Sequence, residues 1–169
     1  QKYYANNNGE LQLGYQSVDG KTYFFSRDKT MYGALKTGKF EVDGQYRIFN
    51  EYLQTGLFEY NGQKYYADDE GNLQLGFQNI EGKKYFFSRD NTQYGVMRTG
   101  KFQIGDFYYC FDDTTGAMFT GLFEYNNQKY YANNNGELQL GYQSIDGKTY
   151  FFSKDKTCLL YTSDAADEL

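Results

Sequence analysis

The chain repeats itself at two periods, and this repetition limits the folds open to it more than any other feature. Gln-Lys-Tyr-Tyr begins at residues 1, 63 and 128, so a large repeat returns about every 62–65 residues. Inside it, the pattern Gly-x-(Leu or Met)-x-(Leu or Thr)-Gly, sometimes truncated, returns about every 20 residues. The closing glycines are Gly14, Gly38, Gly56, Gly76, Gly100, Gly121 and Gly141. Repeats of this length indicate small units that are stable only when stacked on their neighbours.

Each small unit has the pattern of a β-hairpin. In residues 14–25, two runs of β-favouring residues flank Asp19-Gly20. A two-residue hairpin turn needs positive φ, which Asp, Asn and Gly tolerate better than other residues. Glu81 is the residue least suited to such a turn. The matched turns are Asp19-Gly20, Asp43-Gly44, Asn61-Gly62, Glu81-Gly82, Gly105-Asp106, Asn126-Asn127 and Asp146-Gly147.

A polar connection follows each hairpin and leads to one apolar residue. These plug residues are Leu11, Leu35, Leu53, Leu73, Met97, Met118 and Leu138, and we expect them to fill the space between successive hairpins. The alternation of strands predicts an aromatic inner face made of Tyr23, Phe25, Tyr85, Phe87, Tyr150 and Phe152, with Phe24, Phe86 and Phe151 on the other face. The sequence therefore predicts an all-β solenoid of tandem β-hairpin repeats over residues 1–157.

The last residues break the pattern. Residues 153–157 match residues 26–30, but the chain then continues differently from residue 158. Residues 158–169 resemble the translation of an adaptor used in DNA sequencing. We interpret this segment as an assembly artefact with no fold.

Composition excludes several classes of function. Aromatic residues make up 21% of the chain, His is absent, and the net charge is -5. No basic cluster indicates a nucleic-acid partner, and no apolar run is long enough for membrane insertion. Without His, the commonest general acid–base is missing and zinc ligands are scarce. We expect no catalytic residues, no metal site and no cofactor.

Two smaller features have simple interpretations. The acidic runs 68–70 and 112–113 lack the spacing of a calcium loop, and Asn6-Asn7-Asn8 occupies the position that matches the first of them. This favours turn chemistry over calcium binding. Cys110 stands where other repeats have Phe24 and Phe86, so we expect a small apolar filler rather than a reactive thiol.

The hairpin sequences resemble those of a known family of repeats. Gly-Tyr-Gln-Ser-Ile-Asp-Gly-Lys-Thr-Tyr-Phe-Phe (141–152) and Gly-Phe-Gln-Asn-Ile-Glu-Gly-Lys-Lys-Tyr-Phe-Phe (76–87) are similar to the choline-binding-like, cell-wall- and glucan-binding repeats of Gram-positive surface proteins. Within this group, the residues are most similar to the repetitive receptor-binding regions of large clostridial toxins.

The resemblance implies a non-catalytic binding module of a larger secreted or cell-surface bacterial protein, whose missing part could be an enzyme. The implied partners are cell-wall polysaccharide, glucan or a host glycan, and we expect a monomeric rod. Two alternatives stay open: a structural spacer without a ligand, and the receptor-binding region of a toxin.

The resemblance also directs attention to two aromatic positions. In choline-binding members, the residue after the repeat glycine and the eighth residue after it help to cage the quaternary ammonium group. The first is aromatic here only at Tyr15, Phe77 and Tyr142, and the second at Tyr46 and Tyr108. No hairpin has both, which argues against choline and favours a sugar.

Two units carry longer loops, which in solenoids often lie on the binding face. Tyr32 and Tyr94 in these loops are the first candidates for carbohydrate contact. Arg27, Asp28, Arg89 and Asp90 are candidate polar partners. The alternative is a solvated loop whose tyrosine only covers the core.

Overall fold

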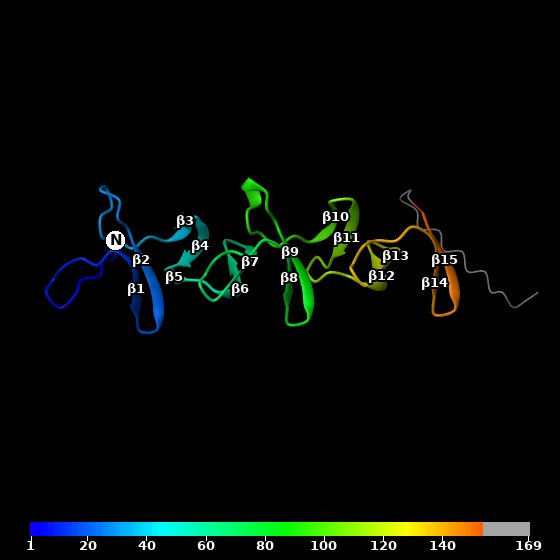
Figure 1. Cartoon of the computed structure of the whole chain (residues 1–169), viewed down its shortest axis with the longest axis horizontal. Coiled ribbons are helices and arrows are strands. Elements are labelled where there is room, and N and C mark those ends of the chain that lie inside the picture. The colour runs from blue at the N-terminus through cyan, green and yellow to red at the C-terminus, as the bar shows by residue number, and fades with distance from the viewer. Residues whose placement is uncertain (154–169) are drawn as a thin grey trace, which may run out of the picture. The chain divides into compact units, whose positions relative to one another are not determined.

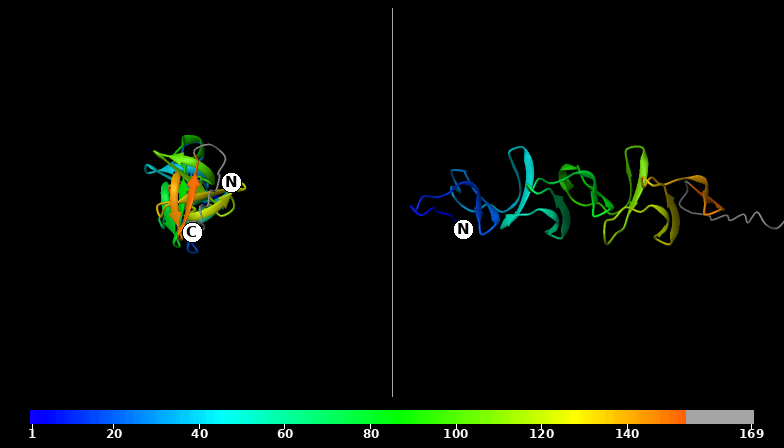
Figure 2. Two further views of the ribbon diagram at one scale, coloured as in Figure 1. Left: turned by 90° about the vertical axis from the view of Figure 1, so that its right-hand side faces the viewer. Right: turned by 60° about the horizontal axis from the view of Figure 1, so that its bottom comes forward.

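The computed structural model describes residues 1–153, which form antiparallel β-hairpins joined by loops. The described part contains seven separate sheets, and its one helical turn is the 3-10 helix η1 (Asn91–Gln93). Figure 2 shows each hairpin as a separate narrow ribbon. The predicted all-β array of tandem hairpins is confirmed. The segment 158–169 and the predicted boundary at residue 157 lie outside the described residues.

The chain divides into two compact units. The first comprises Gln1–Gln78 and Phe87–Met97, and the second comprises Asn79–Phe86 and the chain from Arg98 onward. Figure 1 labels the strands in chain order. They are β1 (Gly14–Val18), β2 (Lys21–Phe25), β3 (Gly38–Val42), β4 (Gln45–Asn50), β5 (Tyr52–Leu53), β6 (Gly56–Tyr60), β7 (Gln63–Ala67), β8 (Gly76–Ile80), β9 (Lys83–Phe87), β10 (Gly100–Ile104), β11 (Phe107–Phe111), β12 (Gly121–Tyr125), β13 (Gln128–Ala132), β14 (Gly141–Ile145) and β15 (Lys148–Phe152).

The hairpins form at the predicted turns. Asp19 and Gly20 have φ of 49° and 73°, and Gly14 pairs with Phe25 at the open end of the same hairpin. Positive φ occurs at both residues in six of the seven turns. The exception is Gly105-Asp106, where only Gly105 has positive φ, as in the turn type that needs glycine at its first central position alone.

Glu81 has a φ of 50°, a conformation that costs most residues with a Cβ roughly 1–2 kcal/mol and that Asn tolerates better. We expect Glu81→Asn to raise the free energy of unfolding by about 1 kcal/mol. Chemical denaturation measures the change. Asn61→Glu, at the matching turn, makes the reverse substitution and should lower stability by a similar amount. Equal stabilities for all three chains would contradict the prediction.

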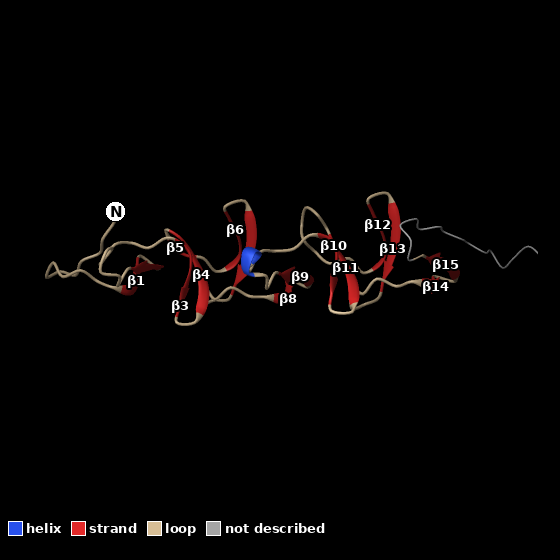
Figure 3. Ribbon diagram, turned by 90° about the horizontal axis from the view of Figure 1, so that it is seen from above, coloured by secondary structure: helices blue, strands red, loops and turns tan. Residues whose placement is uncertain are grey.

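Five of the seven plug residues both complete their own hairpin and bond to the segment before it. Leu73 pairs as a single-residue bridge with Ala67 at the end of β7, and its N–H donates to the carbonyl of Tyr46 in the preceding hairpin at 3.0 Å. The same backbone bond to the preceding hairpin recurs in four further pairs: Leu35 to Lys2, Met97 to Lys64, Met118 to Lys84, and Leu138 to Tyr108. These bonds join successive hairpins within each unit. In Figure 3, β3–β4 and β6–β7 of the first unit nevertheless point in opposite directions.

In four of the Gly-x-(Leu or Met) sequences, the glycine lies against the preceding plug residue. A Cβ built on Gly71, where φ is +79°, would lie 2.4 Å from Leu53, and one built on Gly136 would lie 2.2 Å from Met118. Gly33 and Gly95 show the same relation to Leu11 and Leu73. The motif therefore needs glycine for two reasons, its left-handed backbone and the space its hydrogen leaves.

Aromatic rings fill the space between neighbouring hairpins. Phe87 and Phe111 are fully buried, and Phe25 and Phe152 nearly so, whereas Tyr23 and Tyr150 are only partly buried. The opposite face is covered as well. Phe24 lies 5.5 Å from Phe40 and Phe86 lies 5.8 Å from Phe102, each on the next hairpin.

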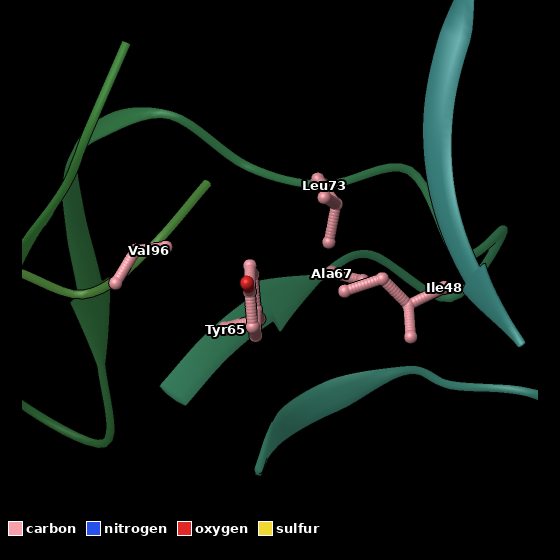
Figure 4. Packing of buried hydrophobic residues seen from close by; sticks show 5 residues of the cluster. All are labelled: Ile48, Tyr65, Ala67, Leu73 and Val96. Atoms are coloured by element: carbon pink, nitrogen blue, oxygen red, sulfur yellow. The ribbon is translucent and has the colours of Figure 1, made fainter. Parts of the chain in front are cut away.

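A small hydrophobic cluster forms where three elements of the first unit meet. It consists of Ile48, Tyr65, Ala67, Leu73 and Val96 (Figure 4). Val96 comes from the loop after β9, and Ile48 comes from β4. The longer loop of residues 88–96 is therefore packed against two earlier hairpins.

Cys110 is completely buried in β11, and burial raises the pKa of its thiol to about 12. We expect iodoacetamide at a pH of about 8, near the ordinary thiol pKa, to leave Cys110 unmodified in the native Cys158→Ser chain. The same chain should react rapidly in guanidinium chloride, because the thiolate is the reactive form. Mass spectrometry counts the adducts. Equal labelling of folded and unfolded protein would contradict the buried filler interpretation.

Within residues 1–153, no group of three His, Cys, Asp or Glu side chains is placed to hold a metal ion. No helix of that part is long and apolar enough to span a bilayer.

Candidate functional site

Two of the predicted aromatic residues lie in contact. The rings of Tyr46 in β4 and Tyr94 after η1 have centroids 4.8 Å apart and are inclined by 46°. Tyr46 remains 37% exposed, and Tyr94 is partly buried against the Ile48 cluster. We call Tyr46 and Tyr94 the tyrosine pair. It presents adjoining aromatic surfaces from segments that lie two hairpins apart in the chain.

Lys39 holds the long loop beside this pair. Its ammonium group donates to the backbone carbonyl of Tyr94 at 3.0 Å and lies 5.4 Å from the ring centroid of Tyr65. Burial lowers the pKa of Lys39 by desolvating its charge. Lys39 follows the repeat glycine Gly38 in β3, so the repeat pattern itself sets its position.

The second unit contains a related but more open arrangement. Tyr108 in β11 matches Tyr46 and is 52% exposed. Lys101 matches Lys39, and its ammonium group donates to the Tyr130 hydroxyl at 3.0 Å. The sequence position that matches Tyr94 is Leu159, which lies outside the described residues.

The polar candidates in the long loops make local contacts. The Oγ of Ser26 donates to the Asp28 carboxylate at 3.3 Å and accepts from the Asp28 N–H at 3.1 Å. Ser88 and Asp90 repeat these two bonds. These aspartates therefore have a turn-forming role whether or not they contact a ligand.

The two arginines and the first tyrosine of the long loops lie apart from the tyrosine pair. Arg27 lies over Gly14 and Arg89 over Gly76, where a built Cβ would lie 2.7 and 2.9 Å from the guanidinium nitrogen. Tyr32 is 54% exposed. Its ring is a candidate contact surface separate from the tyrosine pair.

The remaining predicted rings are partly or largely exposed. Tyr15 is 38%, Phe77 39% and Tyr142 77% exposed. Tyr15 packs on Phe24 at 5.0 Å, and burial raises the pKa of its hydroxyl. Tyr142 makes the corresponding contact with Phe151 at 4.9 Å.

Phe107 was missed by the sequence analysis. It is 50% exposed and directly precedes Tyr108. The other hairpins have Lys or Gln at this first position of the second strand, so alignment of the repeats could have singled it out. The matching residues are Lys21, Gln45, Gln63, Lys83, Gln128 and Lys148.

Two segments of the chain match the family described as "Putative cell wall binding repeat". The matched residues are 55–73 and 120–138, and each segment spans one hairpin with its plug residue. These two segments match the cell wall binding repeat. The predicted resemblance to choline-binding-like, cell-wall-binding repeats is confirmed.

Segments of similar sequence occur in streptococcal glucosyltransferases. Glucosyltransferase-S of Streptococcus mutans is 32% identical over 161 residues, which cover 90% of this chain and 10% of that protein. Glucosyltransferase-I of Streptococcus downei is 27% identical over 133 residues, which cover 75% of this chain and 8% of that protein. The chain thus spans about a tenth of the length of these relatives.

Solved structures contain the same fold. Choline binding protein F of Streptococcus pneumoniae has a TM-score of 0.77 and 25% identity, with 93% of this chain and 55% of that chain covered. CbpJ of the same species has a TM-score of 0.75 at 24% identity, with 88% of this chain and 53% of that chain covered.

Proposed function

We propose that this chain is a polysaccharide-binding region of a larger secreted or surface protein of a Gram-positive bacterium, and that its ligand is a neutral glucan. The observation that carries the proposal is the contact between the exposed Tyr46 and the partly buried Tyr94. Any catalysis by the parent protein belongs to a part outside these repeats.

Adjoining aromatic faces suit a sugar polymer. The apolar faces of hexose rings stack on Tyr, while hydroxyl and amide groups nearby fix orientation by hydrogen bonds. Tyr46 and Tyr94 offer two rings at an angle, and the Lys39 ammonium fixes the loop that carries Tyr94. The relatedness to glucosyltransferases, proteins named for handling glucose units, supports glucan over other cell-wall polymers.

Repetition suits a polymeric ligand in a second way. Exposed aromatic residues recur in both units, including Tyr15, Phe77, Tyr108 and Tyr142. Several weak contacts on one polymer chain give avidity greater than any single site provides. We propose that the region acts as a monomer and gains affinity from the number of repeats rather than from oligomerisation.

Dextran affinity electrophoresis tests the proposal with the full chain. Tyr46→Ala and Tyr94→Ala should each weaken dextran binding by about tenfold, the loss of roughly 1.4 kcal/mol of contact. Tyr3→Ala is the matched control, because Tyr3 is 51% exposed and lies outside the predicted sites. Circular dichroism confirms that each variant is folded.

Two results would reject the proposal. One is unchanged dextran binding in both folded variants. The other is no binding of dextran by the unmodified chain, which with an empty glycan and peptidoglycan screen would favour the spacer role instead. Light scattering at the working concentration tests the monomeric state.

A further inference from the structure

Three large apolar side chains of the first unit are exposed around the loop that contains Gly33. Tyr3 pairs with Ala34 as a single-residue bridge. The Leu11 side chain lies 2.9 Å from a Cβ built on Gly33, and Tyr32 directly precedes that glycine. We call the surface formed by Tyr3, Leu11 and Tyr32 the open face.

The next large repeat has the same residues in a covered state. The residues that match the open face, 62 positions further along the chain, are Tyr65, Leu73 and Tyr94. Tyr65 is 3% exposed where Tyr3 is 51% exposed, and Leu73 is 6% exposed where Leu11 is 42% exposed. Identical residue types therefore occur once buried and once uncovered.

The β3–β4 hairpin and strand β6 provide the cover in that repeat. Ile48 of β4 lies in one hydrophobic cluster with Tyr65 (Figure 4). The ring of Tyr46 contacts the ring of Tyr94 at 4.8 Å, and Phe58 of β6 stacks on Tyr65 at 5.9 Å. The structure thus contains a complete example of what fits against these residues.

The backbone of the open face also matches the covered example. The Leu73 N–H donates to the carbonyl of Tyr46 at 3.0 Å, and the Leu138 N–H donates to the carbonyl of Tyr108 at 2.8 Å. Leu11 has the same place in its repeat, but within residues 1–153 its N–H has no hydrogen-bond partner. An unpaired backbone donor beside apolar side chains is suited to pairing with another β-segment.

We propose that the open face binds a β-hairpin of the kind formed by β3–β4 and β10–β11, supplied by another large repeat of the parent protein. The hairpin provides a carbonyl for the Leu11 N–H, apolar cover for Tyr3 and a ring for Tyr32. Docking thereby completes a second contact like that of Tyr46 with Tyr94. Only the use of this second contact for glucan rests on the proposed function.

A second copy of this chain is a poorer partner for the open face. Both of its hairpins of this kind are already engaged, because the carbonyl of Tyr46 accepts from Leu73 and that of Tyr108 from Leu138. A further repeat whose following plug residue is Leu11 itself has the carbonyl free. The bond count therefore favours a repeat within one array over association of two chains.

An extended chain tests the docking. Residues 63–127 are joined in front of Gln1, which matches Gln128, so that an added β10–β11 hairpin and an added β12 strand precede the full chain. Leu11 remains unique, and NMR follows the hydrogen exchange of its N–H. Exchange should be at least about tenfold slower than in the unextended chain, because a bonded amide exchanges only when its bond opens.

A pair of variants in the same loop links the slowing to the open face. Tyr32→Ala in the extended chain should reverse at least part of the slowing at Leu11, since it removes the ring that meets the added hairpin. Lys29→Ala is the matched control, because Lys29 is exposed in the same loop and is not part of the open face. Circular dichroism confirms that each chain is folded.

Three results would overturn the proposal. The first is equal Leu11 exchange in the folded unextended and extended chains. The second is slowing by dextran in the unextended chain, which would assign the open face to a glycan. The third is slowing with rising concentration of the unextended chain, which would assign it to a second copy. The supporting measurements contain no dextran, so the glucan proposal can fail while the docking stands.

Discussion

Gly71→Ala is expected to lower the free energy of unfolding by about 3 kcal/mol, because a Cβ in left-handed backbone costs roughly 1–2 kcal/mol and overpacking typically adds 1–3 kcal/mol. The new Cβ would lie 2.4 Å from a terminal carbon of Leu53 and 2.7 Å from its Cγ. Because Cγ and both Cδ atoms of Leu53 lie within 2.8 Å of that position, the whole isobutyl group would have to shift. Chemical denaturation followed by circular dichroism measures the loss.

The chain offers two controls for Gly71. Gly9 has the same place in its repeat and a φ of +80°, but nothing lies within 4 Å of a built Cβ. Gly9→Ala should therefore cost only the backbone strain of roughly 1–2 kcal/mol. Leu53→Ala should recover part of the loss when combined with Gly71→Ala, since it removes the overlap. Equal costs at Gly9 and Gly71, with no coupling to Leu53, would contradict this explanation of the motif.

Phe111→Ala is expected to cost about 3–5 kcal/mol of stability, the usual range for removing a fully buried aromatic ring. Phe111 is completely buried at the end of β11. Its ring stacks on Phe102 at a centroid distance of 5.1 Å and meets Phe86 at 6.4 Å. Removing the Phe111 ring eliminates both ring contacts and leaves a cavity between two hairpins. Thermal and chemical unfolding of the variant measure it.

Phe107 provides a control on the same strand. It begins β11, as Phe111 ends it, and is 50% exposed. Phe107→Ala should change stability by less than about 1 kcal/mol, as expected for an exposed site. Similar losses for the two variants would show that the energy lies in strand propensity rather than in packing between hairpins.

The sequence predicted the hairpins well because their determinants are local. A turn such as Asp19-Gly20 acts through φ preferences of two residues, and the strands on either side are set by the alternation of side chains. The plug positions also followed from spacing. The role of the glycine in Gly-x-Leu did not, because it depends on the side chain of the preceding repeat.

The candidate site was only partly predictable. Tyr46 and Tyr94 were each singled out, but for different reasons, and nothing in the sequence indicated that they meet. Their contact depends on how the loop after β9 folds back over two hairpins, a long-range packing event. Asp28 and Asp90 were predicted as ligand contacts, and the structure shows them engaged with Ser26 and Ser88.

The lysine contacts were missed for a related reason. Lys39 and Lys101 each follow a repeat glycine, at the position where three other repeats have an aromatic residue, and the sequence pattern alone gave them no partner. The structure shows that the lysine instead interacts with a ring on the next hairpin. A lysine at the position of an aromatic residue can thus still contact an aromatic side chain of the next hairpin.

The backbone bonds from five of the plug residues to the preceding repeat bear on how such genes evolve. Leu35 bonds to Lys2 in the same way that Met97 bonds to Lys64, so corresponding junctions are chemically interchangeable. Unequal crossing-over that removes or duplicates one large repeat joins two surfaces that already fit. The number of large repeats can therefore change during evolution, because every new junction between repeats reuses an interface that already exists.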